Sequence, residues 1–410
     1  MVEHPSPRRN FRWDIFCRVI DNYGDAAVCW RLARDLTARG ALHVRLWIDQ
    51  PAVLAPLHSS IDAERSSQSV DGVEIRHWAE PFDRRAFGDP ADVVVEGFGC
   101  GLPDAVVEAM AALQDDPSAG TRHRAPSLWI VLEYLSAEPW VAEHHGLPSP
   151  HPRLPLDRYF YFPGFTPETG GLIKEAGLDA RREALQGDAA ARSAWWQRLG
   201  FAPVSEQVLT VSLFGYENDG VASLLEAWAA GKSSVVAAVP PGRLRPQVLQ
   251  WFGGIEAKDG AVLRRGSLEA RLVPFLPQDA YDELLWICDW NFVRGEDSFV
   301  RAQWAVRPLA WQIYPQAEDA HRVKLEAFLD RWCDGLDLQA AAAMRGLWRA
   351  WNGMGAGAGG DCGAAWRALA AHQPALREQA RKWAKALDLS GNLAEKLAQF
   401  CRDRVESRAF

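Results

Sequence analysis

The sequence predicts an α/β protein with two α/β halves in series, followed by a mostly helical C-terminal segment. Short apolar runs alternate with helix-like segments, and this rhythm occurs twice along the chain. The length of 410 residues suits two or three domains of about 150 residues each. Hydrophobic residues make up 48% of the chain and charged residues 24%, a balance typical of globular proteins with full cores.

The first half opens with a β-rich run at 13–20, WDIFCRVI, which ends in a turn-like segment at 21–25. A helical pattern at 26–40 and a second strand at 43–48 follow. Strand, helix and strand in this order form a βαβ unit, which predicts a parallel sheet. Further short apolar runs continue the pattern, at 73–75, 93–95, 128–132 and 159–162.

A charged, helix-favouring segment at 168–199 separates this half from the second. The second half has a helical pattern at 221–230, and beyond 318 the pattern is almost entirely helical. Its expected strands are 207–214, 233–239, 272–275, 288–293 and 309–313. A glycine-rich loop at 353–364 interrupts the C-terminal helices, of which the last two are expected at 374–387 and 394–405.

Composition and charge exclude several classes of protein. The net charge of −8 disfavours a protein that grips nucleic acid, because phosphate contacts dominate such binding. No run reaches the roughly 18 apolar residues of a membrane helix, and the polar opening has no secretory signal. The seven cysteines are scattered without a CxxC motif, which fits the reducing cytoplasm.

The segment DNYGD, from Asp21 to Asp25, is the first candidate site. It follows the first strand, at the edge of an α/β sheet where ligands bind. Asn22, Tyr23 and Gly24 complete it, and we expect the glycine to allow a tight turn. A carboxylate here could act as a general base or position a cationic acceptor. Alternatively, Asp25 is only the N-cap of the following helix.

The second candidate is NFVRGEDS, which runs from the end of a strand into a helix. The amides of Asp297 and Ser298 would lie at a helix start, where anions are favoured. Arg294 offers a planar fork for phosphate oxygens, and Gly295 permits close backbone approach. Glu296 cannot bind an anion by charge, so it needs another role, such as holding a ribose hydroxyl. Alternatively, Asp297 or Ser298 caps the helix, and the flanking charges form a surface pair.

Aromatic residues at strand ends of the second half form the third candidate. Phe214, Tyr216 and Tyr281 could sandwich a nucleobase, and Gln278 could hydrogen-bond its edge. Each taken alone is more typical of a core residue.

The glycine-rich segment 97–101, GFGCG, only loosely matches a dinucleotide loop. No Asp-x-Asp pair follows a strand, so Arg294 and backbone amides would have to neutralise a bound diphosphate, with no metal.

Four segments together resemble the EarP family of bacterial protein-arginine rhamnosyltransferases, which modify elongation factor P. They are DNYGDAAVCWRLARDL, SLFGYEN, NFVRGEDSFVRAQWA and PLAWQIYPQAEDAHRVKLEAFL, in the family's order and through both halves. The resemblance implies a GT-B fold, with two Rossmann-like domains facing a cleft that contains the active site. It also implies inverting transfer from dTDP-β-L-rhamnose to an arginine, without a metal or other cofactor. The expected domains are 1–185, completed by a C-terminal helix at 376–410, and a nucleotide-sugar domain at 186–375.

The resemblance also implies residue roles. Asp25 is expected to be the general base, Asp21 a supporting carboxylate and Glu296 a second essential acid. The remaining expected substrate-binding residues are Asn22, Tyr23 and Gly24 in the first loop, Phe214, Tyr216, Gln278 and Tyr281 around the nucleoside, and Arg294, Gly295, Asp297 and Ser298 around the diphosphate. Family members often carry Phe where this chain has Tyr23 and Tyr281. Two alternatives stay open: a GT-B enzyme with another donor or acceptor, and a non-catalytic nucleotide-sugar-binding adaptor.

Overall fold

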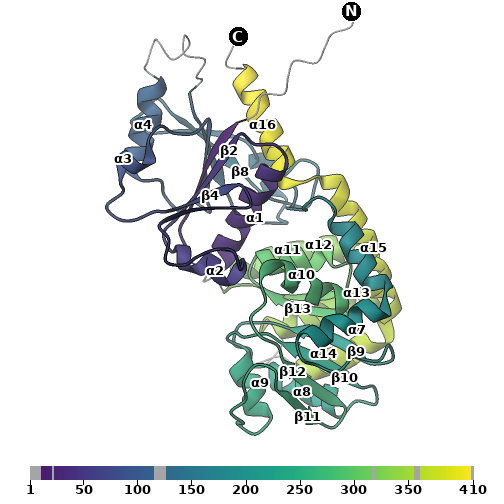
Figure 1. Ribbon diagram of the computed structural model, residues 1–410. Coiled ribbons are helices and arrows are strands. Elements are labelled where there is room, and N and C mark those ends of the chain that lie inside the picture. The colour runs from purple at the N-terminus through teal and green to yellow at the C-terminus, as the bar shows by residue number, and fades with distance from the viewer. Residues whose placement is uncertain (1–10, 21–22, 115–125, 316–319, 355–360, 408–410) are drawn as a thin grey trace, which may run out of the picture. The chain divides into compact units, whose positions relative to one another are not determined.

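The structure, a computed structural model, describes residues 11–20, 23–114, 126–315, 320–354 and 361–407. Contacts divide the chain into two compact units (Figure 1). Unit 1 consists of Met1–Glu175 with Leu387–Phe410, and unit 2 consists of Ala176–Ala386. Each unit contains a largely parallel sheet with helices, so the predicted α/β class is confirmed.

Unit 1 is built on an eight-stranded sheet with the order β3-β4-β2-β1-β5-β6-β8-β7. Only the outermost strands, β3 and β7, pair antiparallel with their neighbours. The strands are β1 (Arg12–Cys17), β2 (His43–Ile48), β3 (Ser67–Val70), β4 (Val73–His77), β5 (Val93–Gly97), β6 (Leu128–Leu132), β7 (Pro148–Pro150) and β8 (Asp157–Tyr161). The central strands are buried almost throughout, as expected when both faces of a parallel sheet are covered.

Two hydrophobic clusters cover the two faces of this sheet. One includes α1 (Gly24–Ala38) and α16 (Leu393–Ser407), which contact each other (Figure 1). The other includes α4 (Asp104–Gln114) and a group of aromatic rings around Phe16. The shorter helices of the unit are η1 (Pro51–Val53), α2 (Leu54–Leu57), α3 (Arg84–Phe87) and α5 (Trp140–His144). The C-terminal helix therefore supplies part of the core of unit 1.

Unit 2 is built on a six-stranded sheet with the order β11-β12-β10-β9-β13-β14. All pairs are parallel except β11 with β12 at one edge. The strands are β9 (Leu209–Leu213), β10 (Val235–Val239), β11 (Val262–Arg265), β12 (Leu268–Leu272), β13 (Trp290–Arg294) and β14 (Leu309–Gln312). The central position of β9 and β13 puts the loops that follow them side by side at one edge of the sheet.

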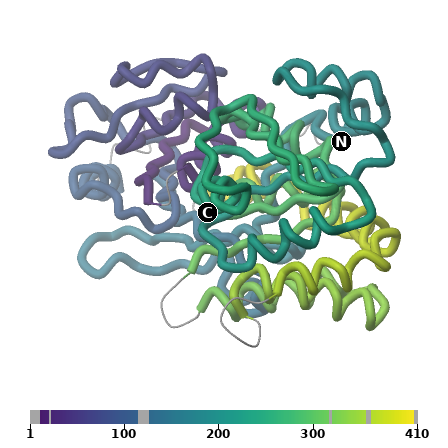
Figure 2. The backbone as a smooth tube through the Cα atoms, turned by 90° about the horizontal axis from the view of Figure 1, so that it is seen from below, coloured from purple at the N-terminus to yellow at the C-terminus, as the bar shows by residue number. Residues whose placement is uncertain are grey.

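Helices surround the second sheet. Near the C-terminal end of the chain, α13 and α14 pack together, and α14 also packs on α8 (Figure 2). The helices are α6 (Leu178–Gly187), α7 (Ala189–Arg198), α8 (Val221–Ala229), α9 (Arg245–Trp251), α10 (Gln278–Ile287), α11 (Asp297–Trp304), α12 (Ala320–Trp332), α13 (Leu338–Trp351), α14 (Cys362–Leu369), η4 (Ala370–His372) and α15 (Gln373–Ser390).

The contacts divide the chain about ten residues away from the expected boundaries at 185 and 376. Helix α6 belongs to unit 2 because Gln186 donates to the carbonyls of Trp286 and Ala305, at 3.0 and 2.9 Å. The first part of α15 also belongs there, because the indole of Trp383 donates to Gln303 at 2.8 Å. Helix α15 therefore contains the boundary between the two units.

Several strand predictions need correction. The strand expected at 272–275 lies earlier, as β12, so 273–275 form the loop before α10. The first strand ends at Cys17 rather than at 20. The expected glycine-rich loop at 353–364 is shorter, because α14 starts at Cys362; residues 355–360 lie outside the described residues. The edge strands β3, β7 and β11 were not predicted.

Two further findings concern the helices and the cysteines. Within the described ranges, no helix is both long and apolar enough to cross a lipid bilayer. All seven cysteines are free thiols, and all except Cys100 are buried.

A close backbone contact attaches the C-terminal segment to unit 1. Leu172 donates its amide to the carbonyl of Gly391 at 3.3 Å and accepts from the amide of Leu393 at 3.0 Å. The neighbouring Gly171 has a φ of +72°, and a Cβ there would lie 2.1 Å from the Gly391 carbonyl oxygen. Only glycine fits at position 171 without moving the backbone.

This contact predicts that Gly171→Ala destabilises the protein much more than a matched substitution, Gly177→Ala. Gly177 is left-handed with a similar φ of +75°, but a Cβ there would have nothing within 4 Å. The left-handed conformation alone should cost about 1 kcal/mol at either position, and the clash should add about 2 kcal/mol at Gly171. Urea unfolding followed by tryptophan fluorescence measures both losses, and equal losses would contradict the importance of the contact.

Candidate functional site

The first candidate loop joins β1 to α1 in unit 1. Asp21 and Asn22 lie outside the described residues. Tyr23 is the N-cap of α1, and its own side chain makes no capping hydrogen bond. Gly24 is the first residue of α1 and has no positive φ, so the expected tight turn at this glycine is wrong. Asp25 is already inside the helix, so the alternative in which it is only an N-cap does not hold.

The Asp25 carboxylate is buried and oriented by hydrogen bonds from two other segments of unit 1. It is 3% exposed, and its Oδ2 accepts from the backbone amide of Ile20 at 2.9 Å. Its Oδ1 accepts from the hydroxyl of Tyr134 at 3.4 Å. The first turn of α1 adds the positive end of the helix dipole, which favours a negative charge. A fixed carboxylate of this kind can accept a proton or hold a cation.

Tyr134 was not among the predicted site residues. It stands two residues beyond β6 and lies face to face with Phe98, with ring centroids 4.6 Å apart. Its position after a predicted strand at 128–132 was the available signal, because loops at that edge of a parallel sheet gather together. We call Ile20, Tyr23, Asp25, Phe98 and Tyr134 the unit 1 cluster.

The second candidate loop is the turn between β13 and α11 in unit 2. Gly295 has a φ of +63°, and Glu296 is the N-cap of α11, without a side-chain cap bond. The Ser298 hydroxyl donates to the carbonyl of Arg294, and this hydrogen bond links the end of β13 to the first turn of α11. Neither Asp297 nor Ser298 is the N-cap, so the capping alternative does not hold.

Arg294 lies over the two aromatic residues that follow β9. The carbon of its guanidinium is 4.7 Å from the ring centre of Phe214 and 4.6 Å from that of Tyr216. Such cation–π contacts are each worth about 0.5–2 kcal/mol, depending on desolvation. The side chain is half-buried rather than a surface group. These three residues, which were predicted in two separate candidate sites, lie together within unit 2.

The start of α10 completes this group. Gln278 is 3% exposed and donates to the Asp297 carboxylate at 3.3 Å. The ring of Tyr281 lies edge-on to that of Phe214, with centroids 5.8 Å apart. Burial raises the pKa of the Tyr281 phenol, and nearby Arg294 offsets part of this effect. The phenol therefore stays neutral at physiological pH. The unit 2 cluster consists of Phe214, Tyr216, Gln278, Tyr281, Arg294, Asp297 and Ser298.

Two residues of β14 that were not predicted hold these loops in place. Gln312 accepts from the amide of Tyr216 at 2.9 Å and donates to the carbonyl of Glu217 at 3.1 Å. The indole of Trp311 donates to the carbonyl of Gly295 at 2.9 Å. Both are in the apolar run expected as a strand at 309–313, and a glutamine at the end of such a run was the available signal.

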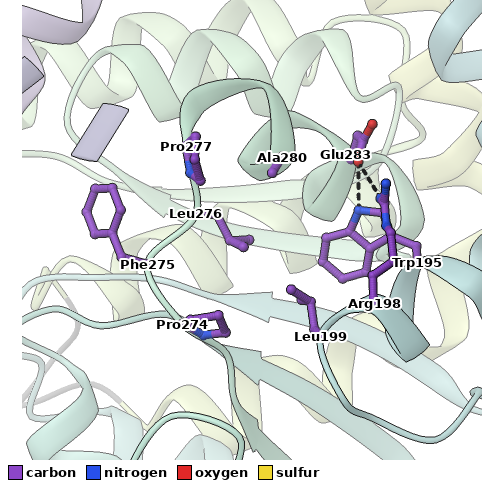
Figure 3. Close-up of a pocket in the computed structure, with 9 residues that line it drawn as sticks. All are labelled: Trp195, Arg198, Leu199, Pro274, Phe275, Leu276, Pro277, Ala280 and Glu283. Atoms are coloured by element: carbon purple, nitrogen blue, oxygen red, sulfur yellow. Dashed lines mark hydrogen bonds and ion pairs between the residues drawn. The ribbon is translucent and has the colours of Figure 1, made fainter. Parts of the chain in front are cut away.

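A hollow of about 340 Å³ lies beside α10, but it contains none of the predicted residues (Figure 3). Its charged groups are already engaged, because Glu283 accepts from Trp195 at 2.9 Å and from Arg198 at 2.8 Å. Its lining residues are Trp195, Arg198, Leu199, Pro274, Phe275, Leu276, Pro277, Ala280 and Glu283. The hollow therefore offers no open positive charge for a diphosphate.

The side chains that most often coordinate metal ions are those of His, Cys, Asp and Glu. In the described part of the chain, no three His, Cys, Asp or Glu residues are grouped so that they could hold a metal ion. Positive charge near the β13 turn comes instead from Arg294 and the start of α11.

Comparisons with known proteins agree along nearly the whole chain. The family model described as Elongation-Factor P (EF-P) rhamnosyltransferase EarP matches residues 13–402. A protein-arginine rhamnosyltransferase of Pseudomonas putida is 47% identical, over 96% of this chain and 99% of the relative. A protein of the same name from Neisseria meningitidis serogroup B is 33% identical, over 94% of this chain and 96% of the relative.

A solved structure also matches this chain. It is described as the structural basis for EarP-mediated arginine glycosylation of translation elongation factor EF-P. It is 36% identical and covers 96% of this chain and 99% of its own, with a TM-score of 0.65. The sequence resemblance and the predicted GT-B fold are thus confirmed. This chain belongs to the EarP family of elongation factor P rhamnosyltransferases.

Proposed function

We propose that this protein moves L-rhamnose from dTDP-β-L-rhamnose to an arginine side chain of elongation factor P in the cytoplasm. We further propose that transfer inverts the anomeric carbon and needs neither a metal nor another cofactor. The observation that carries the proposal is the unit 2 cluster, where a guanidinium over two aromatic rings lies at a helix start. The named activity of the relatives supports the choice of sugar and acceptor.

The unit 2 cluster has the parts that a nucleoside diphosphate requires. Arg294 and the backbone amides at the start of α11 supply positive charge and donors for phosphate oxygens. The aromatic rings supply apolar faces for a base and a ribose, and buried Gln278 supplies an amide for the base edge. As the sugar–phosphate bond breaks, the charge that develops on dTDP is stabilised by Arg294.

Asp25 is the proposed general base. A guanidinium is protonated at neutral pH, with a pKa above about 12, and is therefore a poor nucleophile. A fixed carboxylate localises its charge and accepts a proton as the new carbon–nitrogen bond forms. The nitrogen attacks the anomeric carbon from the side opposite the leaving dTDP, whose oxygen takes the electron pair of the broken bond. This sequence inverts the configuration at that carbon.

We also propose roles for the remaining site residues that were predicted from the sequence. Glu296, at the N-cap of α11, is proposed as a second essential acid. Asp21 is proposed to support the base, and Asn22 to line the same loop. Tyr23, Gly24 and Gly295 are proposed to shape the loops around the substrates.

The decisive test incubates the protein with elongation factor P and dTDP-β-L-rhamnose. We expect the intact mass of elongation factor P to rise by one deoxyhexose, with fragmentation placing it on an arginine. Transfer in the presence of a chelator tests metal independence. Transfer from UDP-glucose but not from dTDP-rhamnose would reject the donor, and no transfer from any nucleotide sugar would favour a binding adaptor.

Asp25→Asn should lower the transfer rate about a thousandfold, because a general base contributes a factor of about 10²–10⁴. Its dTDP affinity should stay within about twofold, because the donor-binding residues are in unit 2. A matched control is Asp104→Asn, an exposed first-turn aspartate of α4, the helix after neighbouring β5. Its rate should be unchanged. Unchanged turnover by Asp25→Asn would refute the base assignment.

Arg294→Ala should weaken dTDP binding about 30-fold, since a charged hydrogen bond to phosphate is worth about 1.5–3 kcal/mol. Arg265→Ala is the matched control, because Arg265 lies 4.4 Å over the Trp251 ring but on the edge strand β11. Isothermal titration with dTDP compares both variants with the parent protein. Equal affinities for all three would remove Arg294 from the diphosphate site.

A further inference from the structure

The glycine-rich loop after β5, which resembled a dinucleotide loop only loosely, fixes one aromatic ring. Phe98 has a φ of +56°, a conformation that is unfavourable for a residue with a bulky side chain. Gly99 and Gly101 have φ values of +60° and +75°, which glycine adopts without strain. The amide of Phe98 donates to the carbonyl of Leu132, at the end of β6, at 2.6 Å. The loop is thus attached to the neighbouring strand end.

The ring fixed in this way supports Tyr134. The two rings are nearly parallel, with an interplanar angle of 24° and centroids 4.6 Å apart, and Phe98 is 8% exposed. Tyr134 has a half-buried side chain whose hydroxyl reaches the Asp25 carboxylate. A strained residue that persists in a structure is compensated by its surroundings, and such residues cluster at functional sites. Here the strained residue is Phe98, whose ring stacks on that of Tyr134. The Tyr134 hydroxyl in turn contacts Asp25, the proposed base.

The two oxygens of Asp25 have donors from different segments. Ile20 donates to Oδ2 through its backbone at 2.9 Å, and Tyr134 donates to Oδ1 through its hydroxyl at 3.4 Å. Rotation of a carboxylate about its last bond is otherwise loosely restrained. With both donors present, the plane of the carboxylate is set. The second contact is long for an O–H···O bond, as catalytic hydrogen bonds often are before the substrates bind.

We propose that Tyr134 is a positioning residue for the transfer reaction, held in place by the Phe98 ring and the 97–101 loop. Its hydroxyl fixes the plane of the Asp25 carboxylate, so that the carboxylate is oriented to receive a proton from the acceptor nitrogen. This inference rests on the proposed role of Asp25 as the general base. Orientation of this kind lowers the barrier of the chemical step and leaves substrate affinity unchanged.

The test compares Tyr134→Phe with the parent protein in steady-state transfer to elongation factor P. This variant keeps the ring on Phe98 and removes only the hydroxyl. We expect kcat to fall about tenfold, while KM for dTDP-rhamnose and for elongation factor P stays within about twofold. The melting temperature should stay within about 2 °C, since a half-buried hydroxyl contributes little to stability.

Two further variants separate positioning from a structural role. Tyr159→Phe is the matched control, because Tyr159 is also a tyrosine of unit 1 packed against an aromatic ring, Phe400, but it lies on β8. It should leave kcat and both KM values unchanged. Phe98→Leu removes the supporting ring and keeps the Tyr134 hydroxyl, so it should lower kcat about threefold without changing KM for the donor. Phe98→Tyr, which restores a ring, should recover most of that loss.

The outcomes distinguish this inference from the proposed base. An unchanged kcat in Tyr134→Phe, together with loss of transfer in Asp25→Asn, would overturn the positioning role and leave the base assignment intact. A rise confined to KM for elongation factor P would also overturn it, because Tyr134 would then bind the acceptor. If Asp25→Asn retains full turnover, the base assignment itself fails, whatever the result at position 134.

Discussion

The backbone of the loops at the carboxyl ends of parallel strands must find hydrogen-bond partners outside the sheet, and this constraint shapes both clusters. The strand ladders stop at Cys17 and Arg294, but the backbone continues through polar turns. Side chains form hydrogen bonds with the backbone groups that lie beyond the strand ends. Asp25 accepts from the amide of Ile20, and Gln312 bonds with two backbone groups of the loop after β9. The same contacts that satisfy the backbone therefore fix the side chains available for chemistry.

The position of Arg294 changes how the aromatic residues of unit 2 are interpreted. From the sequence, Phe214 and Tyr216 were candidates to sandwich a base. In the structure each ring has the guanidinium over it, at 4.7 and 4.6 Å. An aromatic surface solvates a guanidinium less strongly than water does, so the cation keeps more of its attraction for an anion. In the proposed donor site, the rings would therefore support diphosphate binding through Arg294, in addition to any contact that they make with the nucleoside.

Apolar runs in the sequence predicted most of the inner strands, because strands covered on both faces are largely apolar. Leu128–Leu132 matches its prediction for this reason. The inner strand β12 was misplaced, since its sequence LEARL contains two charged residues. The edge strands β3 and β7 were not predicted. The sequence of β3, SQSV, is mostly polar and that of β7, PSP, contains two prolines, as is typical of edge strands. The prediction of Asp25 came from its place after a strand. Tyr134 also follows a predicted strand, but its contact with Asp25 joins residues 109 apart, and the sequence pattern does not specify such a pair.

The two clusters are each shaped by contacts within one unit. Asp25 accepts hydrogen bonds from Ile20 and Tyr134, both of unit 1. The rings under Arg294 and the indole that holds Gly295 belong to unit 2. Preorganisation is efficient when the groups are fixed before the substrates arrive, because no reorganisation is then needed during the reaction. Under the proposed roles, the donor would bind to groups already fixed in unit 2, and the base would already be oriented within unit 1.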